Sequence, residues 1–316
     1  MAAGTATTVA TSVAQLGVNY CAPVGDLNYL FWLAVALMVS VVAILFMIGR
    51  SLQRKDLEAI ARDEIKQVAL SVVIGIVIVS VASAFCMLSG VMIQNIGGGS
   101  MTHFQYAGKY LNALINNIGM PVIKNLWSYS YFFTNLAQIG PAEYRGSNIM
   151  NGFSIVAQAA ETINGYVLVP LVSSLGIQQI LLQAAEAFSF TLLLPCGMIL
   201  RVIRPTRMAG CFLIAASFGA YVIWPMTYVI NYQITMSIFP EFEQGISETM
   251  FGSFLSAIPS AIMDPLGTLR IASEKLFLFL DEAAILLPQA VVLPVLSLVL
   301  TTTFIGVFTE YLHELR

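Results

Sequence analysis

The sequence predicts an all-α fold, namely a polytopic helical membrane protein with about five to seven transmembrane helices. Two observations predict this class. The chain of 316 residues is 58% hydrophobic, and its apolar residues gather in long runs. Only 10% of the residues are charged, whereas a soluble domain carries about 25%. Because so few charges do not cover a water-exposed surface, we expect residues 1–316 to form a single membrane-embedded helical domain.

Five segments have the length and composition of a membrane-spanning helix, which needs roughly 20 mostly apolar residues. They are residues 27–49, 68–88, 176–200, 208–232 and 289–308. The first two segments form an N-terminal helical hairpin over 27–90. The next two form a second hairpin over 176–232, and the last one precedes a short tail.

Two further segments, 101–172 and 233–286, are apolar but interrupted. The first contains Pro121 and the motif GPAEYRG, and the second contains three prolines. We expect interfacial or partly embedded broken helices on the outer side of the membrane. An additional helical hairpin within 101–172 would raise the number of spans from five to about seven.

The basic residues indicate the orientation of the chain, because short cytoplasmic loops are enriched in Lys and Arg. Loop 50–66 carries five basic residues, and turn 201–207 carries three basic residues and no acid. Segment 233–286 carries seven acids and two bases. We therefore predict a multi-pass protein of the cell membrane with the N-terminus outside and the C-terminus in the cytoplasm.

The sequence also lacks the usual signs of an enzyme or of a secreted protein. We find no HExxH helix, no GxxxxGK(S/T) loop and no GxSxG turn, and the only histidines are His103 and His313. The four cysteines form no CxxC pair. Residues 1–25 carry no side-chain charge, so we expect no signal peptide. We predict no catalytic activity, no metal site and no cofactor.

The predicted topology gives the cysteines two alternative interpretations. Cys21 precedes the first span and Cys86 ends the second, so both fall near the outer face, where a disulfide between them would persist. Alternatively, all four cysteines are small buried hydrophobic residues.

Polar side chains follow one stripe of the third predicted span. Gln179, Gln183 and Glu186 are four and three residues apart, which places them on the same face of a helix. An ionisable group within a span usually faces the bundle interior or a wet cavity, so this stripe is a candidate polar path. The alternative interpretation is a polar seam between helices, or a helix end close to the headgroups.

The block from Leu192 to Ile230 follows the pattern P-x-G-x-x-x-R…R-x-x-G…P. The matching positions are Pro195, Gly197, Arg201, Arg204, Pro205, Arg207, Gly210 and Pro225. This block resembles archaeal polytopic proteins of the CedA type, which are the membrane channel component of the crenarchaeal DNA-exchange system. These proteins are in turn similar to the TrbL-class inner-membrane proteins of type IV secretion. The stretch ARDEIKQVALSVVIGIVIV also resembles the charged start of the second span of that family.

The resemblance implies a membrane channel or channel-scaffold subunit of a type IV secretion-like DNA-transfer apparatus. The resemblance also implies the partners of this subunit, namely a cytoplasmic ATPase, small membrane or pilin-like subunits, and DNA in transit. It further implies that the chain works within an oligomer or complex. Arg201, Arg204 and Arg207 would then meet DNA phosphate at the cytoplasmic mouth. Without the resemblance, the same arginines anchor the turn in the lipid headgroups. The alternative functions are a small-solute or ion transporter and a non-conducting structural subunit.

Overall fold

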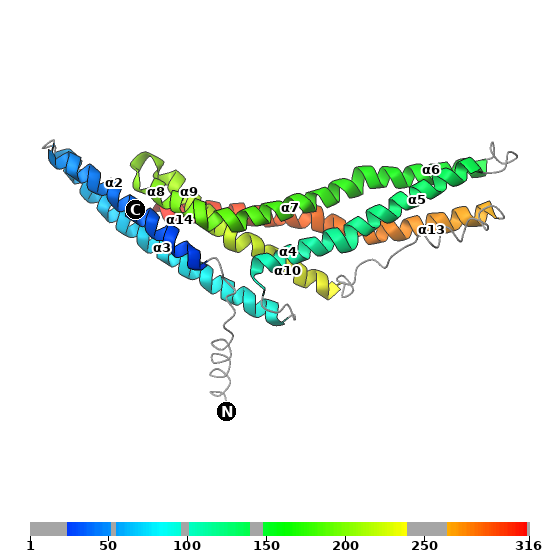
Figure 1. Cartoon of the computed structure of the whole chain (residues 1–316), viewed down its shortest axis with the longest axis horizontal. Coiled ribbons are helices and arrows are strands. Elements are labelled where there is room, and N and C mark those ends of the chain that lie inside the picture. Colours follow the sequence, from blue (N-terminus) through cyan, green and yellow to red (C-terminus); the bar gives the residue numbers. More distant parts are fainter. Residues whose placement is uncertain (1–23, 52–54, 96–100, 140–147, 239–263, 315–316) are drawn as a thin grey trace, which may run out of the picture. The chain divides into compact units, whose positions relative to one another are not determined.

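The computed structural model describes residues 24–51, 55–95, 101–139, 148–238 and 264–314, and every regular element within them is a helix (Figure 1). Five of these helices are long and apolar enough to cross a membrane: Phe31–Ser51, Glu64–Ser89, Gly152–Val202, Arg207–Ile238 and Pro288–Glu314. Four of them contain a predicted span, and Phe31–Ser51 overlaps the predicted span 27–49. The prediction of a helical membrane protein is confirmed at this level.

The N-terminal hairpin consists of α2 (Val24–Ser51) and α3 (Lys55–Asn95). One face of α2 is buried at helical spacing, at Phe31, Ala34, Met38 and Val42. The helix α3 begins within the basic loop, so the charged stretch before the second span is helical.

The middle of the chain forms two long helical runs instead of a series of broken helices. The first run comprises α4 (His103–Ala113), η1 (Leu114–Gly119) and α5 (Met120–Ile139). The second comprises α6 (Asn148–Ile163), η2 (Asn164–Leu168), α7 (Val169–Phe188), η3 (Ser189–Leu193) and α8 (Leu194–Val202). The apolar part of the second run has 51 residues, which at 1.5 Å per residue gives roughly 75 Å. A hydrocarbon core of about 30 Å holds less than half of that length.

The C-terminal part begins with a short 3-10 turn, η4 (Arg204–Thr206), which leads into α9 (Arg207–Phe218), η5 (Gly219–Ile223) and α10 (Trp224–Ile238). It continues with α13 (Pro265–Ala284), η6 (Pro288–Val292) and α14 (Leu293–Glu314). Helix α13 lies in the predicted broken segment 233–286, of which residues 239–263 lie outside the described residues.

A π-helix before a proline explains why the helical runs continue where prolines predict breaks. Each of the five π-helices η1, η2, η3, η5 and η6 ends two residues before a proline; these prolines are Pro121, Pro170, Pro195, Pro225 and Pro294. The residue preceding each proline donates its N–H to the carbonyl five residues back, as from Leu194 to Ser189. Proline lacks an N–H, and its ring clashes with the carbonyl four residues back in a regular α-helix. One wider turn relieves this clash, so the helix passes through the proline without ending.

The described residues form two compact units. The first unit contains residues 1–106, 184–229 and 301–316, and the second contains 107–183 and 230–300. A core of aromatic rings packs the second unit, in which Phe133 lies 4.6 Å from Tyr129 and 5.7 Å from Phe153, measured between ring centroids. That the whole chain behaves as one membrane-embedded domain stays a prediction.

Candidate functional site

The residues of the family-like pattern build a tight helical hairpin in the first unit. α8 and α9 approach so closely that a Cβ atom placed on Gly210 would lie 2.4 Å from the backbone nitrogen of Arg201. A Cβ atom on Gly197 would lie 2.9 Å from the backbone nitrogen of Ile214. Both glycines are therefore needed for backbone contact between the two helices, as small residues are at membrane helix interfaces.

Arg201, the first arginine of the pattern, lies inside the unit with 2% of its surface exposed. Its Nη2 donates a hydrogen bond to the carbonyl oxygen of Leu312 in α14, at 3.1 Å. Its Nε and Nη1 have no hydrogen-bond partner among the described residues. A buried charge that is poorly paired costs several kcal/mol, typically ~3–5 kcal/mol when one partner is missing. Within the described residues, the Nε and Nη1 atoms of Arg201 therefore lack the acceptors that would offset this cost.

Arg207 is already paired within the first unit. Its Nη2 lies 3.2 Å from a carboxylate oxygen of Glu64 at the start of the second span, and its Nε donates to the carbonyl of Arg201 at 3.3 Å. Thr206 closes the turn with a hydrogen bond from its hydroxyl to the carbonyl of Leu200. The side chain of Arg204 lies outside the described residues. The turn predicted to meet phosphate thus joins α3, α8, α9 and α14 in this arrangement, and the contact with phosphate stays a prediction.

His103 lies in a second buried polar region of the first unit. Its Nε2 is 3.1 Å from the carbonyl oxygen of Tyr221, so Nε2 carries the hydrogen and donates it. Its Nδ1 is 3.6 Å from the sulfur of Cys86. Burial lowers the pKa of His103 from 6.5 to about 4, although the hydrogen bond to Tyr221 opposes this shift. His103 is therefore neutral at pH 7.

The π-helices η3 and η5 bring further polar groups into this region. The hydroxyls of Ser189 in η3 and Tyr221 in η5 are buried and have no partner among the described residues. The ring of Tyr221 packs against Phe190 in a tilted arrangement with centroids 4.1 Å apart, and Glu186 is close enough to interact electrostatically with Tyr221. Tyr221 is not predicted from the sequence, because no local motif marks it and its partners are far away along the chain.

The predicted stripe of Gln179, Gln183 and Glu186 lies along α7 as its spacing requires. Gln183 is exposed, and the other two are half-buried. The neighbouring Gln178 is buried, and its Nε2 lies within hydrogen-bond distance of the carbonyl of Ala290 and the hydroxyl of Ser174. The two glutamines of the stripe belong to the second unit and Glu186 to the first, so a path along them stays a prediction.

The cysteines divide into two groups. Cys86 is disulfide-bonded, whereas Cys196 and Cys211 are free thiols. Cys21 lies outside the described residues, so its pairing with Cys86 stays a prediction. Among the residues that the structure describes, no group of three or more His, Cys, Asp or Glu side chains is placed to hold a metal ion.

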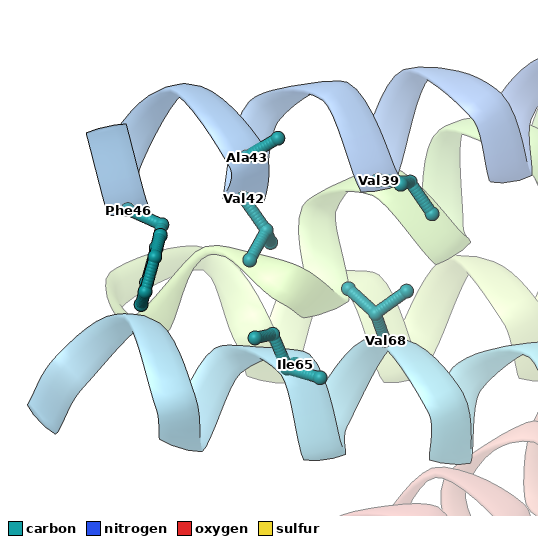
Figure 2. Close-up of a pocket in the computed structure, with 6 residues that line it drawn as sticks. All are labelled: Val39, Val42, Ala43, Phe46, Ile65 and Val68. Atoms are coloured by element: carbon teal, nitrogen blue, oxygen red, sulfur yellow. The ribbon is translucent and has the colours of Figure 1, made fainter. Parts of the chain in front are cut away.

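An apolar cavity of about 250 Å³ lies between α2 and α3 (Figure 2). Val39, Val42, Ala43 and Phe46 line it from α2, opposite Ile65 and Val68 from α3. With no hydrogen-bonding side chain in its lining, this cavity is suited to hydrocarbon and not to a reaction.

No protein-family model, curated protein or solved structure matches this chain. The function is therefore argued from the residues and the packing described above.

Proposed function

We propose that this chain is a membrane-embedded channel or channel-scaffold subunit of a type IV secretion-like DNA-transfer apparatus. The proposal combines the resemblance of block 192–230 with the way in which that block folds. Gly197 and Gly210 make the backbone contact, and Arg201 is buried behind it. Residues that are merely part of an ordinary basic turn would instead point their charges into water or headgroups.

The single observation that carries this proposal is the burial of Arg201 with two unpaired nitrogens. A guanidinium that keeps two of its nitrogens unpaired inside a helical bundle adds little to stability, because a buried charge without good partners is unfavourable. A functional role therefore explains the presence of this buried guanidinium better than a contribution to packing does. In the proposed complex, Arg201 binds an acceptor group of a partner subunit or DNA phosphate during transfer.

The apolar surface of the helices supports an assembly role. Many large hydrophobic side chains are exposed, for example Val295, Leu296 and Leu298 in α14. Lipid covers such a surface in an isolated subunit, and neighbouring subunits cover part of it in a complex. The proposed partners are a cytoplasmic ATPase and small membrane or pilin-like subunits.

The proposal is tested by affinity purification from native membranes in mild detergent, followed by identification of the recovered proteins. A second tagged multi-span protein from the same membranes serves as the control. We expect a secretion-type ATPase and pilin-like subunits to be recovered with this chain and not with the control. Recovery of the chain alone, or only with proteins that the control also recovers, would exclude the DNA-transfer role.

A small-solute or ion transporter is the second candidate, and the half-buried Glu186 together with the buried hydroxyls of Ser189 and Tyr221 favours it. Polar groups at irregular helix segments are typical of transport sites. Reconstituted liposomes distinguish the two candidates. Solute-stimulated uptake that is lost in Glu186→Gln supports the transporter, whereas a stable complex without uptake supports the DNA-transfer subunit.

A further inference from the structure

A polar cavity of about 350 Å³ lies within the second unit, between α5 and the run α6–η2–α7. The two helices lie side by side along the unit (Figure 1). Four residues of α5 at helical spacing line one wall, namely Trp127, Ser130, Tyr131 and Thr134. The other wall consists of Glu161, Asn164, Gly165 and Val169. This cavity is separate from the arginine turn and from the cluster around Tyr221, which belong to the first unit.

The cavity coincides with a change in helix geometry. η2 begins at Asn164, and Gly165 is its second residue. A Cβ atom placed on Gly165 would meet no heavy atom within 4 Å, so this position opens onto free space. Pro170 is the residue that favours the wide turn, as at the other four π-helices. Single π-turns of this kind occur frequently at functional sites.

The lining offers hydrogen-bond acceptors and a negative charge. The Glu161 carboxylate makes no hydrogen bond or ion pair with the described residues. Asn164 is 3% exposed, and its Nδ2 donates to the carbonyl of Ile123 at 3.3 Å, but its Oδ1 has no partner among those residues. The Thr134 hydroxyl donates to the carbonyl of Ser130 and keeps its lone pairs. A ligand that donates hydrogen bonds and carries positive charge matches this set.

Two aromatic rings favour an organic cation over a metal ion as the ligand. Trp127 and Tyr131 are one helical turn apart and are 64% and 68% exposed. Aromatic faces attract organic cations, and a carboxylate beside them adds charge pairing. A bare metal ion would prefer six or more oxygen ligands in a smaller space. The cavity volume lies at the lower end of small-molecule sites, about 300 Å³ and above.

We propose that this cavity binds an alkylammonium group through the Glu161 carboxylate and the Trp127 and Tyr131 rings. Asn164 lies in the wall, and its Oδ1 is an acceptor without a partner among the described residues. Two sources provide the same chemistry, namely a soluble amine and the ammonium headgroup of a lipid. Trp and Tyr residues favour the headgroup level of a bilayer, so both sources have access to such a site.

The first experiment measures binding of putrescine to the purified full chain in detergent by calorimetry. 1,4-Butanediol has the same carbon chain without the charges and serves as the ligand control. Putrescine should bind saturably and the diol should not. We expect Glu161→Gln to weaken binding about tenfold or more, which is the effect of one lost charge-assisted hydrogen bond. Gly165→Leu should abolish binding by filling the cavity.

Glu310→Gln is the matched protein control, since Glu310 is an exposed carboxylate outside the second unit. It should leave the affinity unchanged. The second arm compares nanodiscs of phosphatidylethanolamine and phosphatidylglycerol, with bound lipid quantified after purification. Enrichment of phosphatidylethanolamine that is lost in Glu161→Gln assigns the site to a lipid headgroup.

Three outcomes would overturn the proposal: equal binding of the diol, equal binding by Glu161→Gln, or saturable ammonium binding in neither arm. Size-exclusion profiles of the variants check that each has folded. If Gly165→Leu does not fold, the isosteric Glu161→Gln still decides the result.

Discussion

At the residue scale, burial in the first unit determines the properties of three residues. His103 is neutral because burial lowers its pKa to about 4. Arg201 is buried with unpaired nitrogens. Gly210 has no room for a side chain. Each of these features yields a prediction that the substitution of one residue tests.

His103 should make the protein sensitive to acid. Its pKa is lower in the folded protein than the ordinary value of 6.5, so the unfolded chain binds more protons between about pH 6.5 and pH 4. The contribution of neutral His103 is complete above pH 6.5 and is lost as the pH falls to about 4. The difference of 2.5 pKa units corresponds to about 3 kcal/mol. Thermal unfolding in detergent from pH 4 to 7.5 should show this loss.

Two variants control this prediction. His103→Gln keeps a donor for the carbonyl of Tyr221 and should flatten the pH dependence. His313 is exposed, so His313→Gln should leave the dependence as in the wild type. An unchanged slope in His103→Gln would contradict the assignment.

Gly210→Ala should separate α8 from α9. The added methyl group would lie 2.4 Å from the backbone nitrogen of Arg201, so the backbone of one helix would have to shift. We expect a loss of roughly 2 kcal/mol or more, the usual effect of overpacking. Gly306→Ala is the control, because a Cβ atom there meets nothing within 4 Å. That helical substitution should be neutral or stabilise by about 0.5–1 kcal/mol, and equal unfolding temperatures for the two variants would refute the close contact.

Arg201→Met should separate stability from function. Replacing a poorly paired buried charge by an apolar side chain is often neutral or stabilising by ~1–4 kcal/mol. The melting temperature should therefore be kept or raised, while recovery of the proposed ATPase and pilin-like partners falls. A lower melting temperature with unchanged partners would show that Arg201 is purely structural.

At the element scale, the π-helices have a definite role. A π-turn accommodates one extra residue in the helix and thereby avoids the steric clash with proline. The residues after the π-turn keep the same faces of the helix as those before it. Deleting Val167 from η2 together with Pro170→Ala should restore a regular α-helix and keep the core residues on their face. Deleting Ile180 from the regular helix α7 should rotate everything that follows by about 100° and prevent folding. The yield of monodisperse protein measures both, and equal yields would contradict this account.

The sequence predicts these elements only in part. Apolar runs of about 20 residues coincide with the five helices that are long and apolar enough to cross a membrane, since length and hydropathy are local properties. Pro121 suggests a break, yet the helix continues from His103 to Ile139, because a π-turn accommodates the proline. Likewise, 176–200 is only part of a run from 148 to 202, since apolar composition alone does not mark where a helix leaves the membrane.

The candidate site was predicted to a lesser extent. The arginines of turn 201–207 are visible in the sequence as charges, but the burial of Arg201 depends on Leu312, which is more than a hundred residues away. The same holds for Glu64 as the partner of Arg207. The polar cavity near Glu161 was missed, because Trp127 and Asn164 form no motif and meet only when α5 packs against the next helical run.

At the scale of the whole molecule, we predict a multi-span membrane protein with its termini on opposite sides of the membrane. An odd number of spans requires this arrangement, and the basic loops predict the N-terminus outside. The apolar helices account for membrane association. The orientation and the number of spans are the predictions on which the proposed complex depends, since a cytoplasmic ATPase must find its docking surface on the inner side.

The most direct test labels single cysteines with a membrane-impermeant maleimide, in a chain whose four native cysteines are serine. Ala2→Cys should react in intact cells, and Glu314→Cys should react only after the membrane is permeabilised. The chain should also stay in the membrane pellet after alkaline carbonate extraction. Release by carbonate, or labelling of both termini from the same side, would contradict the five-span account.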